Sequence, residues 1–156
     1  MRVLAPLAIL LALFALPARA DEPKKEAPLP CSVDKLDKEW GLKLKSATVR
    51  DNVYLKAPVR ELVVTLEFTK DVTDAKAVRK AFESSILEGK PVKDRPPHVL
   101  FYLFDEDNVS IGKLNVVYIE GEITGKSGDA FRVTVRTYGD TLKKAKKVDL
   151  RMSEKD

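Results

Sequence analysis

Cysteine and histidine, the residue types best suited to nucleophilic and acid–base chemistry, each occur once in this chain, as Cys31 and His98. A thiol activated by a neighbouring imidazole is the nucleophile of many small hydrolases and thiol enzymes. No third residue is evident that would orient the imidazole, and neither residue lies in the sequence context of a catalytic motif. A small hydrolase or thiol enzyme that uses Cys31 or His98 is therefore the alternative hypothesis. The sequence favours a protein without catalytic residues, metal centre or cofactor.

Two further segments come close to ligand-binding loops without matching them. The segment 121–127, GEITGKS, has three residues between its glycines where a phosphate-binding loop has four, so it predicts a turn between strands. The segment 105–108, DEDN, is followed by Ser110 and Val116 where a calcium-binding EF-hand requires glycine and glutamate. An irregular calcium site there stays open beside a solvated turn. Asn108 begins a glycosylation sequon, which matters only in a host that glycosylates asparagine.

The N-terminus predicts export. Arg2 precedes the apolar run Leu7–Leu16, and Ala18–Ala20 places small residues where a signal peptidase cleaves. We therefore expect residues 1–20 to be a cleaved signal peptide and the secreted or periplasmic protein to begin near Asp21. The apolar run is shorter than the roughly 20 residues of a membrane-spanning helix, so an uncleaved anchor is only the alternative. No second apolar stretch follows, and we expect the exported chain not to span a membrane.

Charge and cysteine content narrow the class of protein further. Loss of the signal peptide lowers the basic residues from 28 to 26 against 24 acidic ones, so the formal net charge falls from +4 to +2. Such a balanced charge gives no support to nucleic-acid binding. Cys31 follows Pro30 and lies far from the apolar run, which argues against a lipid anchor. As the single cysteine it is either free or paired with another molecule. The sequence predicts no oligomeric state.

The hydrophobic pattern predicts one mainly β domain over residues 40–156, preceded by a flexible tether over 21–39. Alternation of apolar and polar residues indicates half-buried strands, with a turn signal at Asp51–Asn52. Apolar residues at helical spacing indicate one short helix over 74–86. Extended segments are expected over 41–49, 53–55, 60–69, 98–104, 109–113, 114–123, 130–138 and 146–152. The pattern amounts to about seven strands with one inserted helix, the layout of an antiparallel Greek-key sandwich.

The order of these segments resembles a known family of small exported domains. WGLKLKSATV is followed by RELVVTLEFTKDV, HVLFYLFDEDNVSIGK and GDAFRVTV. This succession is similar to immunoglobulin-like β-sandwich domains of the FxLyD type. Phe101–Asp105 with Gly112 matches the family's aromatic-Leu-aromatic-Asp strand and the glycine after it, and Gly128–Phe131 matches the opening of a later strand. The resemblance covers residues 40–152 and implies an accessory module, with no catalytic residues carried over. The helix over 74–86 departs from the family pattern.

The same alternation predicts which side chains form the core between the two sheets. On this interpretation, one side of each central strand is wholly apolar. The expected core is Leu62, Val64, Leu66, Phe68, Leu100, Tyr102, Phe104, Phe131, Val133, Val135 and Leu150.

Charged residues on the opposite side of the last two strands suggest the one binding surface. If the strand over 130–138 pairs with the strand over 146–152, their outward positions share a face. The predicted anion-binding residues on that face are Arg132, Arg136, Lys147 and Arg151. They would contact an acidic protein, a lipid headgroup or a polyanion of the cell envelope, although a charged and solvated sheet face is the simpler interpretation. The sequence thus predicts an exported, non-catalytic binding or structural module of unknown ligand.

Overall fold

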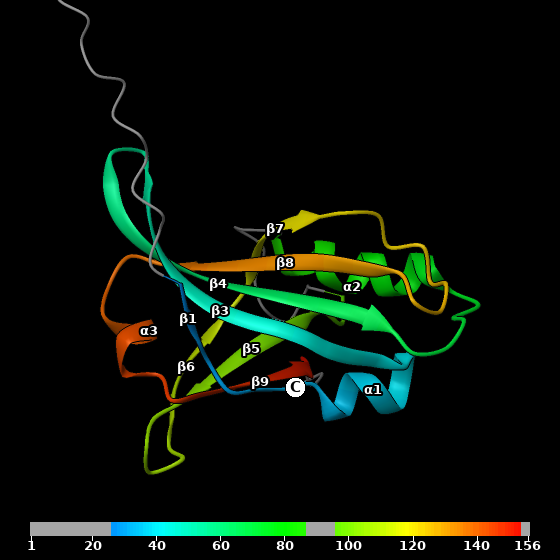
Figure 1. The fold of residues 1–156 in the computed structure, drawn as a ribbon, viewed down its shortest axis with the longest axis horizontal. Coiled ribbons are helices and arrows are strands. Elements are labelled where there is room, and N and C mark those ends of the chain that lie inside the picture. Colours follow the sequence, from blue (N-terminus) through cyan, green and yellow to red (C-terminus); the bar gives the residue numbers. More distant parts are fainter. Residues whose placement is uncertain (1–25, 87–95, 154–156) are drawn as a thin grey trace, which may run out of the picture.

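The computed structural model describes residues 26–86 and 96–153, which form two β-sheets and three helices (Figure 1). The five-stranded sheet has the order β1 (Glu26–Pro28), β3 (Leu42–Tyr54), β4 (Ala57–Phe68), β8 (Ala130–Thr137) and β7 (Val116–Glu120). The four-stranded sheet has the order β2 (Cys31–Ser32), β9 (Lys147–Met152), β5 (Val99–Phe104) and β6 (Ser110–Leu114). The helices are α1 (Asp34–Trp40), α2 (Ala75–Ile86) and α3 (Thr141–Lys144). The prediction of a mainly β chain with antiparallel pairing is confirmed, apart from the parallel pair β2–β9.

The core lies between the inner faces of the two sheets, where the predicted apolar positions of β4 and β8 meet. Eight of the predicted core residues are buried: Leu62, Val64, Leu66, Phe68, Phe131, Val133, Val135 and Leu150. Helix α2 was expected over nearly the same residues. Its Phe82 ring contacts the edge of Phe131 with ring centroids 5.2 Å apart, so α2 packs against the inner face of the five-stranded sheet.

The register of β5 differs from the prediction. The side chains of Val99, Phe101 and Leu103 are fully buried, whereas the expected core residues Leu100, Tyr102 and Phe104 are half-buried on the opposite face. The strand is apolar on both sides, so alternation alone does not decide which side faces the core. This correction turns two aromatic rings outward.

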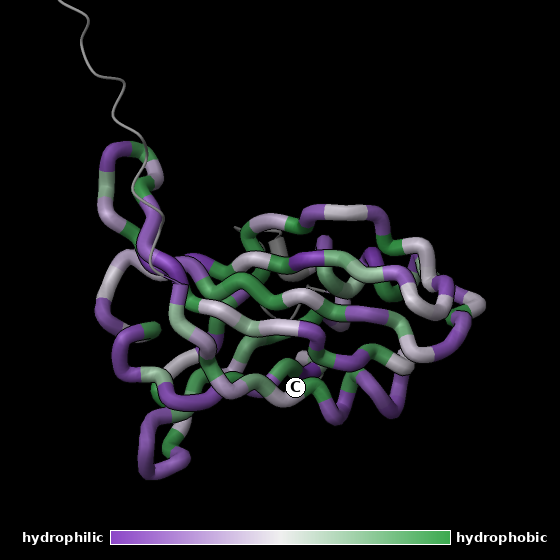
Figure 2. The backbone as a smooth tube through the Cα atoms, viewed as in Figure 1, coloured by the Kyte–Doolittle hydropathy of each residue, from purple (hydrophilic) through white to green (hydrophobic). Residues whose placement is uncertain are grey.

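The β3–β4 hairpin is longer than the sequence predicts. Asp51–Asn52 does not form a turn, because β3 continues through it to Tyr54. The chain reverses instead at Leu55 and Lys56, whose φ angles are 50° and 66°. The end of this hairpin extends beyond the body of the two sheets at the upper left of Figure 1. Figure 2 shows apolar as well as polar residues along this extension.

The folded domain begins before Trp40, which corrects the predicted tether over 21–39. Strand β1 pairs with β3, and β2 pairs with β9 in the other sheet. Helix α1 buries Leu36 completely, and it ends at Gly41, whose φ of 60° lets its N–H donate to the Asp37 carbonyl oxygen at 2.7 Å. The short strands β1 and β2 raise the number of strands in the described residues to nine. The predicted signal peptide and residues 21–25 lie outside the described residues.

Candidate functional site

The four predicted anion-binding residues do not share a face. Strand β8, which carries Arg132 and Arg136, pairs with β4 and β7 in the five-stranded sheet. Strand β9, which carries Lys147 and Arg151, pairs with β5 and β2 in the four-stranded sheet. The predicted pairing of the last two strands is therefore wrong, and the anion site built on it is not formed. Both strands have the same alternating pattern, which places side chains on a face but does not assign a strand to a sheet.

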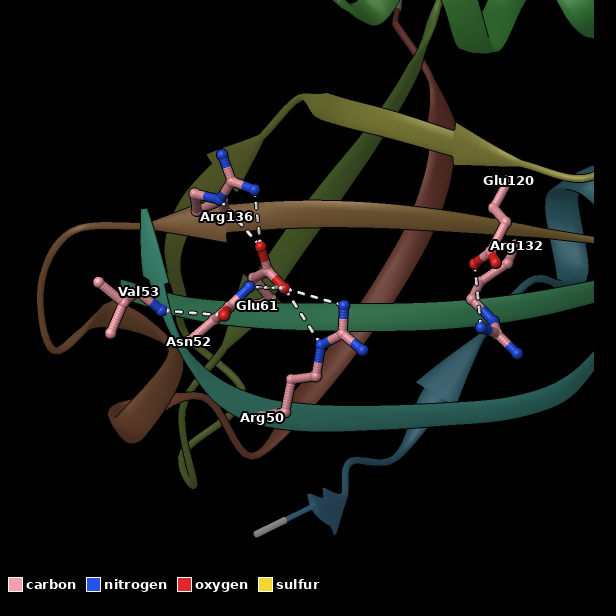
Figure 3. A network of polar contacts seen from close by, with 7 residues as sticks. All are labelled: Arg50, Asn52, Val53, Glu61, Glu120, Arg132 and Arg136. Atoms are coloured by element: carbon pink, nitrogen blue, oxygen red, sulfur yellow. Dashed lines mark hydrogen bonds and ion pairs between the residues drawn. The ribbon is translucent and has the colours of Figure 1, made fainter. Parts of the chain in front are cut away.

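The two arginines of β8 are each paired with a carboxylate on their own sheet (Figure 3). Arg132 donates to the exposed carboxylate of Glu120 on β7 at 3.0 Å. Arg136 donates to one oxygen of Glu61 through two nitrogens, at 2.7 and 3.0 Å. Arg136 also lies over the ring of Tyr54, 3.9 Å from its centroid. These contacts give each guanidinium group a carboxylate partner within the protein.

Glu61 is the centre of this network, and its side chain faces outward on β4 yet is only 1% exposed. Its second oxygen accepts hydrogen bonds from Asn52 at 3.0 Å and from Arg50 at 3.1 Å. Burial by itself raises the pKa of Glu61, but the hydrogen bonds from Arg136, Asn52 and Arg50 outweigh burial and hold the pKa below its ordinary value. The arrangement joins β3, β4 and β8 and is structural.

The four-stranded sheet has a different outer surface, which we name the aromatic–basic face. Its members are Tyr102, Phe104, Lys113, Lys147 and Arg151. The ammonium nitrogen of Lys113 lies 5.1 Å from the centroid of the Tyr102 ring, and that of Lys147 lies 5.9 Å from the centroid of Phe104. The Arg151 guanidinium lies 5.1 Å from the Tyr102 centroid and 5.7 Å from that of Phe104. Two half-buried rings are thus surrounded by three cations.

Strand register explains why these residues converge. Tyr102 lies opposite Lys113 of β6 on one side and Asp149 of β9 on the other, and Phe104 lies opposite Lys147. The Asp149 carboxylate accepts a hydrogen bond from Arg151 at 2.7 Å, so Arg151 is partly neutralised. Within the described residues, neither lysine of the face lies within ion-pair distance of a carboxylate. The face therefore keeps positive charge available to a ligand.

Two of the five residues of this face were predicted as binding residues from the sequence, and three were missed. Lys147 and Arg151 were predicted to bind anions, whereas Tyr102 and Phe104 were assigned to the core and Lys113 was not considered. The sequence did contain one indication: Tyr102 and Phe104 occupy alternate positions of one segment, and cations occur in two later segments, 109–113 and 146–152. That indication becomes informative only when β6 and β9 are known to flank β5.

Cys31 and His98, the residues of the alternative enzyme hypothesis, are not brought together. Cys31 pairs with Val148 near the start of β9, whereas the backbone of His98 is bonded to Ser153 just beyond its end. Five residues of extended chain separate these points by about 16 Å. Burial, together with the nearby Asp149 carboxylate, raises the pKa of the Cys31 thiol to about 12. At neutral pH this thiol is protonated and is a poor nucleophile.

His98 has structural partners in place of catalytic ones. Its backbone N–H donates to the Ser153 hydroxyl at 3.1 Å, and its carbonyl oxygen accepts from the Ser153 N–H at 2.7 Å. Its Nδ1 lies 2.9 Å from the carbonyl oxygen of Pro96 and 3.2 Å from the Ser153 hydroxyl. The buried imidazole thus helps to join the start of β5 to the end of β9.

The two loop motifs also have structural explanations. The Asp105 carboxylate accepts hydrogen bonds from the N–H groups of Asp107 and Val109, which closes the β5–β6 turn on itself. In the segment 121–127, Gly125 has a φ of 74°, and a Cβ there would lie 2.8 Å from that of Ala75. That segment leads into a strand, as expected for a turn. No group of three or more histidine, cysteine, aspartate or glutamate side chains is placed to hold a metal ion within residues 26–86 and 96–153.

A hollow of about 230 Å³ lies where the β3–β4 hairpin extends beyond the body of the two sheets. Its lining includes two ion pairs, Arg60 with Asp51 and Lys143 with Asp140. Equal numbers of cations and anions leave it without a preferred charge for a ligand. The aromatic–basic face is the stronger candidate site.

Comparisons with protein-family models, with curated proteins and with solved structures found no significant match to this chain. The resemblance to FxLyD-type immunoglobulin-like domains therefore stays a prediction. In the part of the chain that the structure describes, none of the helices has the length and apolar character needed to cross a membrane.

Proposed function

We propose that this chain is an exported, non-catalytic module that binds a polyanion of the cell envelope through the aromatic–basic face. The observation that carries the proposal is the pair of half-buried rings, Tyr102 and Phe104, surrounded by three cations. Two of those cations, Lys113 and Lys147, have no carboxylate partner among the described residues. An immunoglobulin-like sandwich on the predicted FxLyD pattern would be a suitable scaffold for such a module.

The spacing of the cations suits a ligand with repeated negative charge. Strands β6 and β9 flank β5 on opposite sides, and Lys113 lies opposite Tyr102 whereas Lys147 lies opposite Phe104. Two strand spacings across the sheet and two residues along it place the Cα atoms of the two lysines about 12 Å apart. The rings between them exclude water and strengthen the attraction of the cations for an anion. Lys143, Lys144 and Lys146 are also exposed, and the Lys146 N–H donates to the Phe104 carbonyl oxygen at 2.8 Å. A basic segment thus continues the face at the Phe104 end.

The proposal of a non-catalytic role is supported by the chemistry of the two candidate catalytic residues. The Cys31 thiol is protonated at neutral pH, and the His98 imidazole is buried in contact with Pro96 and Ser153. Export is supported by the order of basic residue, apolar run and small residues in the segment 1–20. Intact-mass analysis of the secreted product tests export, and we expect a chain that begins at or near Asp21.

Heparin chromatography tests the proposed site, with immobilised heparin as the polyanion probe. We expect the secreted protein to be retained at low salt and released as salt rises, because the Debye length falls to about 10 Å at 0.1 M. The double variant Lys113→Gln/Lys147→Gln should elute at clearly lower salt. The control Lys43→Gln/Lys45→Gln removes the same charge from lysines that are paired with Glu67 on the other sheet, and it should elute close to the unmodified protein.

Two results would contradict the proposal. Equal losses in both double variants would mean that heparin senses only net charge. Absence of salt-sensitive retention in the unmodified protein would mean that the aromatic–basic face is a solvated sheet surface without a polyanion ligand.

A further inference from the structure

The end of the β3–β4 hairpin carries three consecutive exposed apolar residues. Val53 is 68% exposed, Tyr54 is 40% exposed and Leu55 is 81% exposed. With Lys56 they form what we name the hairpin tip, residues 53–56. The tip is the end of the hairpin that extends beyond the body of the two sheets (Figure 1). Its apolar side chains do not contribute to the core.

The backbone conformation of the tip disfavours leucine at position 55, so the stability of the fold does not explain why Leu55 is there. Leu55 and Lys56 both have positive φ angles, 50° and 66°, in a two-residue turn. Such turns favour Asn-Gly, because residues with larger side chains are strained in the left-handed region. Leucine at this position is therefore unfavourable in conformation and in exposure at once. Unfavourable features that persist at one site indicate a function for that site.

The arrangement of the apolar side chains favours lipid over a protein partner. Val53 and Tyr54 are successive residues of a strand, so they point to opposite sides of the hairpin, and Leu55 lies at its end. A protein surface would contact one side, whereas lipid surrounds an inserted tip on all sides. Pairing of Val53 with Pro58 and of Tyr54 with Ala57 keeps the strands of the tip joined to each other, as a shallow position in a bilayer requires.

The charges beneath the tip complement an anionic membrane surface. Lys56 lies in the turn and is exposed, and Arg136 lies over the ring of Tyr54. Arg50 and Arg60 lie on the two strands below and are paired with Glu61 and Asp51, and Arg136 of the neighbouring strand β8 is also paired with Glu61. Together with Lys56, these three arginines exceed the two carboxylates by two positive charges. Tyrosine and lysine also have the amphipathic side chains that are common at the membrane interface.

We infer that the hairpin tip inserts into the headgroup–acyl boundary of an anionic lipid bilayer. Val53, Tyr54 and Leu55 enter the boundary, and the exposed ammonium group of Lys56 contacts lipid phosphates. This inference goes beyond the proposed function, because the tip lies on the five-stranded sheet and the aromatic–basic face lies on the other. The tip would hold the module at a membrane while the face remains free for its polyanion.

Vesicle flotation tests the inference with a variant designed to leave the fold intact. The probe is vesicles of phosphatidylcholine with roughly one-quarter phosphatidylglycerol, and the protein is the secreted product. Leu55→Asn/Lys56→Gly installs the preferred turn sequence, so its thermal unfolding midpoint should stay the same or rise by a few degrees. Lys56→Gly alone should weaken vesicle binding by about fivefold. The double variant should weaken it by a further tenfold or more, because leucine burial is lost.

A fluorescence comparison between two exposed valines locates the contact. Val53 lies in the hairpin tip, and Val109, which is 57% exposed, lies in the turn between β5 and β6. Trp40 is present in both variants and gives the same background signal. We expect the emission of Val53→Trp to shift to shorter wavelength with vesicles and that of Val109→Trp to stay unchanged.

Three results would overturn the inference: no flotation of the unmodified protein, flotation of the double variant at the unmodified level, or equal emission shifts in both tryptophan variants. The first result would leave a protein partner as the occupant of the tip. Heparin retention of Leu55→Asn/Lys56→Gly should fall no further than that of Lys56→Gly, which separates failure at the tip from failure of the aromatic–basic face.

Discussion

Glu61 is a carboxylate that lies almost fully buried on the outer side of a β-sheet, where most side chains are solvated. It is stable there because it accepts hydrogen bonds from two arginines and an asparagine. The lowered pKa of Glu61 means that the folded protein holds the charged form more strongly than the unfolded chain does. Its ion pairs therefore contribute stability above the ordinary glutamate pKa of about 4.3, and this contribution is lost as pH falls through the lowered value.

Replacement of Glu61 by glutamine should reveal that contribution. We expect Glu61→Gln to lower the free energy of unfolding at pH 7 by about 2–3 kcal/mol, because Arg50 and Arg136 lose their buried counter-charge. The variant should also lose less stability than the unmodified protein between neutral and acid pH. Glu120→Gln is the matched control, since it removes an exposed partner of Arg132 and should cost less than about 0.5 kcal/mol. Urea unfolding at several pH values measures the loss of unfolding free energy in both variants. Equal losses in Glu61→Gln and Glu120→Gln would show that the burial of Glu61 does not affect stability.

Among the elements, β5 has the greatest influence on what the protein can bind, because its two faces carry different kinds of apolar residue. The inward face holds Val99, Phe101 and Leu103, and the outward face holds the aromatic rings of the aromatic–basic face. A slip by one residue would exchange these faces and bury the aromatic–basic face. The pairing of β5 with β9, from Val99 to Phe104, fixes its register.

A pair of alanine variants tests this register. Phe101→Ala should lower the free energy of unfolding by about 3–5 kcal/mol, because it leaves a cavity in the core. Phe104→Ala should cost clearly less, about 1–2 kcal/mol, since its ring is half-buried, and it should also weaken heparin retention. Chemical denaturation of both variants gives the comparison. A larger loss for Phe104→Ala than for Phe101→Ala would restore the face predicted from the sequence.

The inward side of a strand was predicted correctly where the opposite side carries charged residues. Strands β4 and β8 alternate apolar residues with glutamate or arginine, and their inner faces were predicted correctly. Where the local sequence pattern gave a wrong prediction, contacts with residues on another strand determined the structure. Considered without the rest of the chain, Asp51 and Asn52 favour a turn. In the structure, Asp51 forms an ion pair with Arg60, and Asn52 donates a hydrogen bond to Glu61. Those partners lie across the hairpin, so strand conformation satisfies polar groups that would otherwise favour a turn.

The same limit applies to the candidate site. The cations of the last two strands were identified from alternation, but their distribution between the two sheets depends on pairings of β8 with β4 and of β9 with β5. These pairings join residues far apart in the sequence. Lys147 and Arg151 were therefore placed beside the wrong neighbours, and the aromatic partners Tyr102 and Phe104 were found only from the fold.

At the scale of the whole molecule, the segment 26–40 joins the two sheets before the main hairpin begins. Strand β1 adds to the edge of the five-stranded sheet and β2 to the edge of the four-stranded sheet. Leu29 between them is buried, and its N–H donates to the Ala47 carbonyl oxygen at 3.1 Å. Helix α1 then contacts both β3 and β9. The segment thus closes one side of the space between the two sheets. Residues 21–39 were predicted to form a tether because residues 21–30 are charged and proline-rich and residues 31–39 are mostly polar.

Leu36→Ala tests whether this segment belongs to the folded domain. Val33, Leu36 and Trp40 are spaced so that they share one side of α1, and Leu36 is fully buried within the core. We expect the variant to lower the free energy of unfolding by about 2–5 kcal/mol, the range for large-to-small changes in a packed interior. Glu39→Ala, an exposed change in the same helix, should stay within about 0.5 kcal/mol of the unmodified protein. Urea unfolding of both variants distinguishes the two cases. If both variants unfolded at the same urea concentration as the unmodified protein, the segment would contribute nothing to the domain, and the sandwich would begin at Trp40.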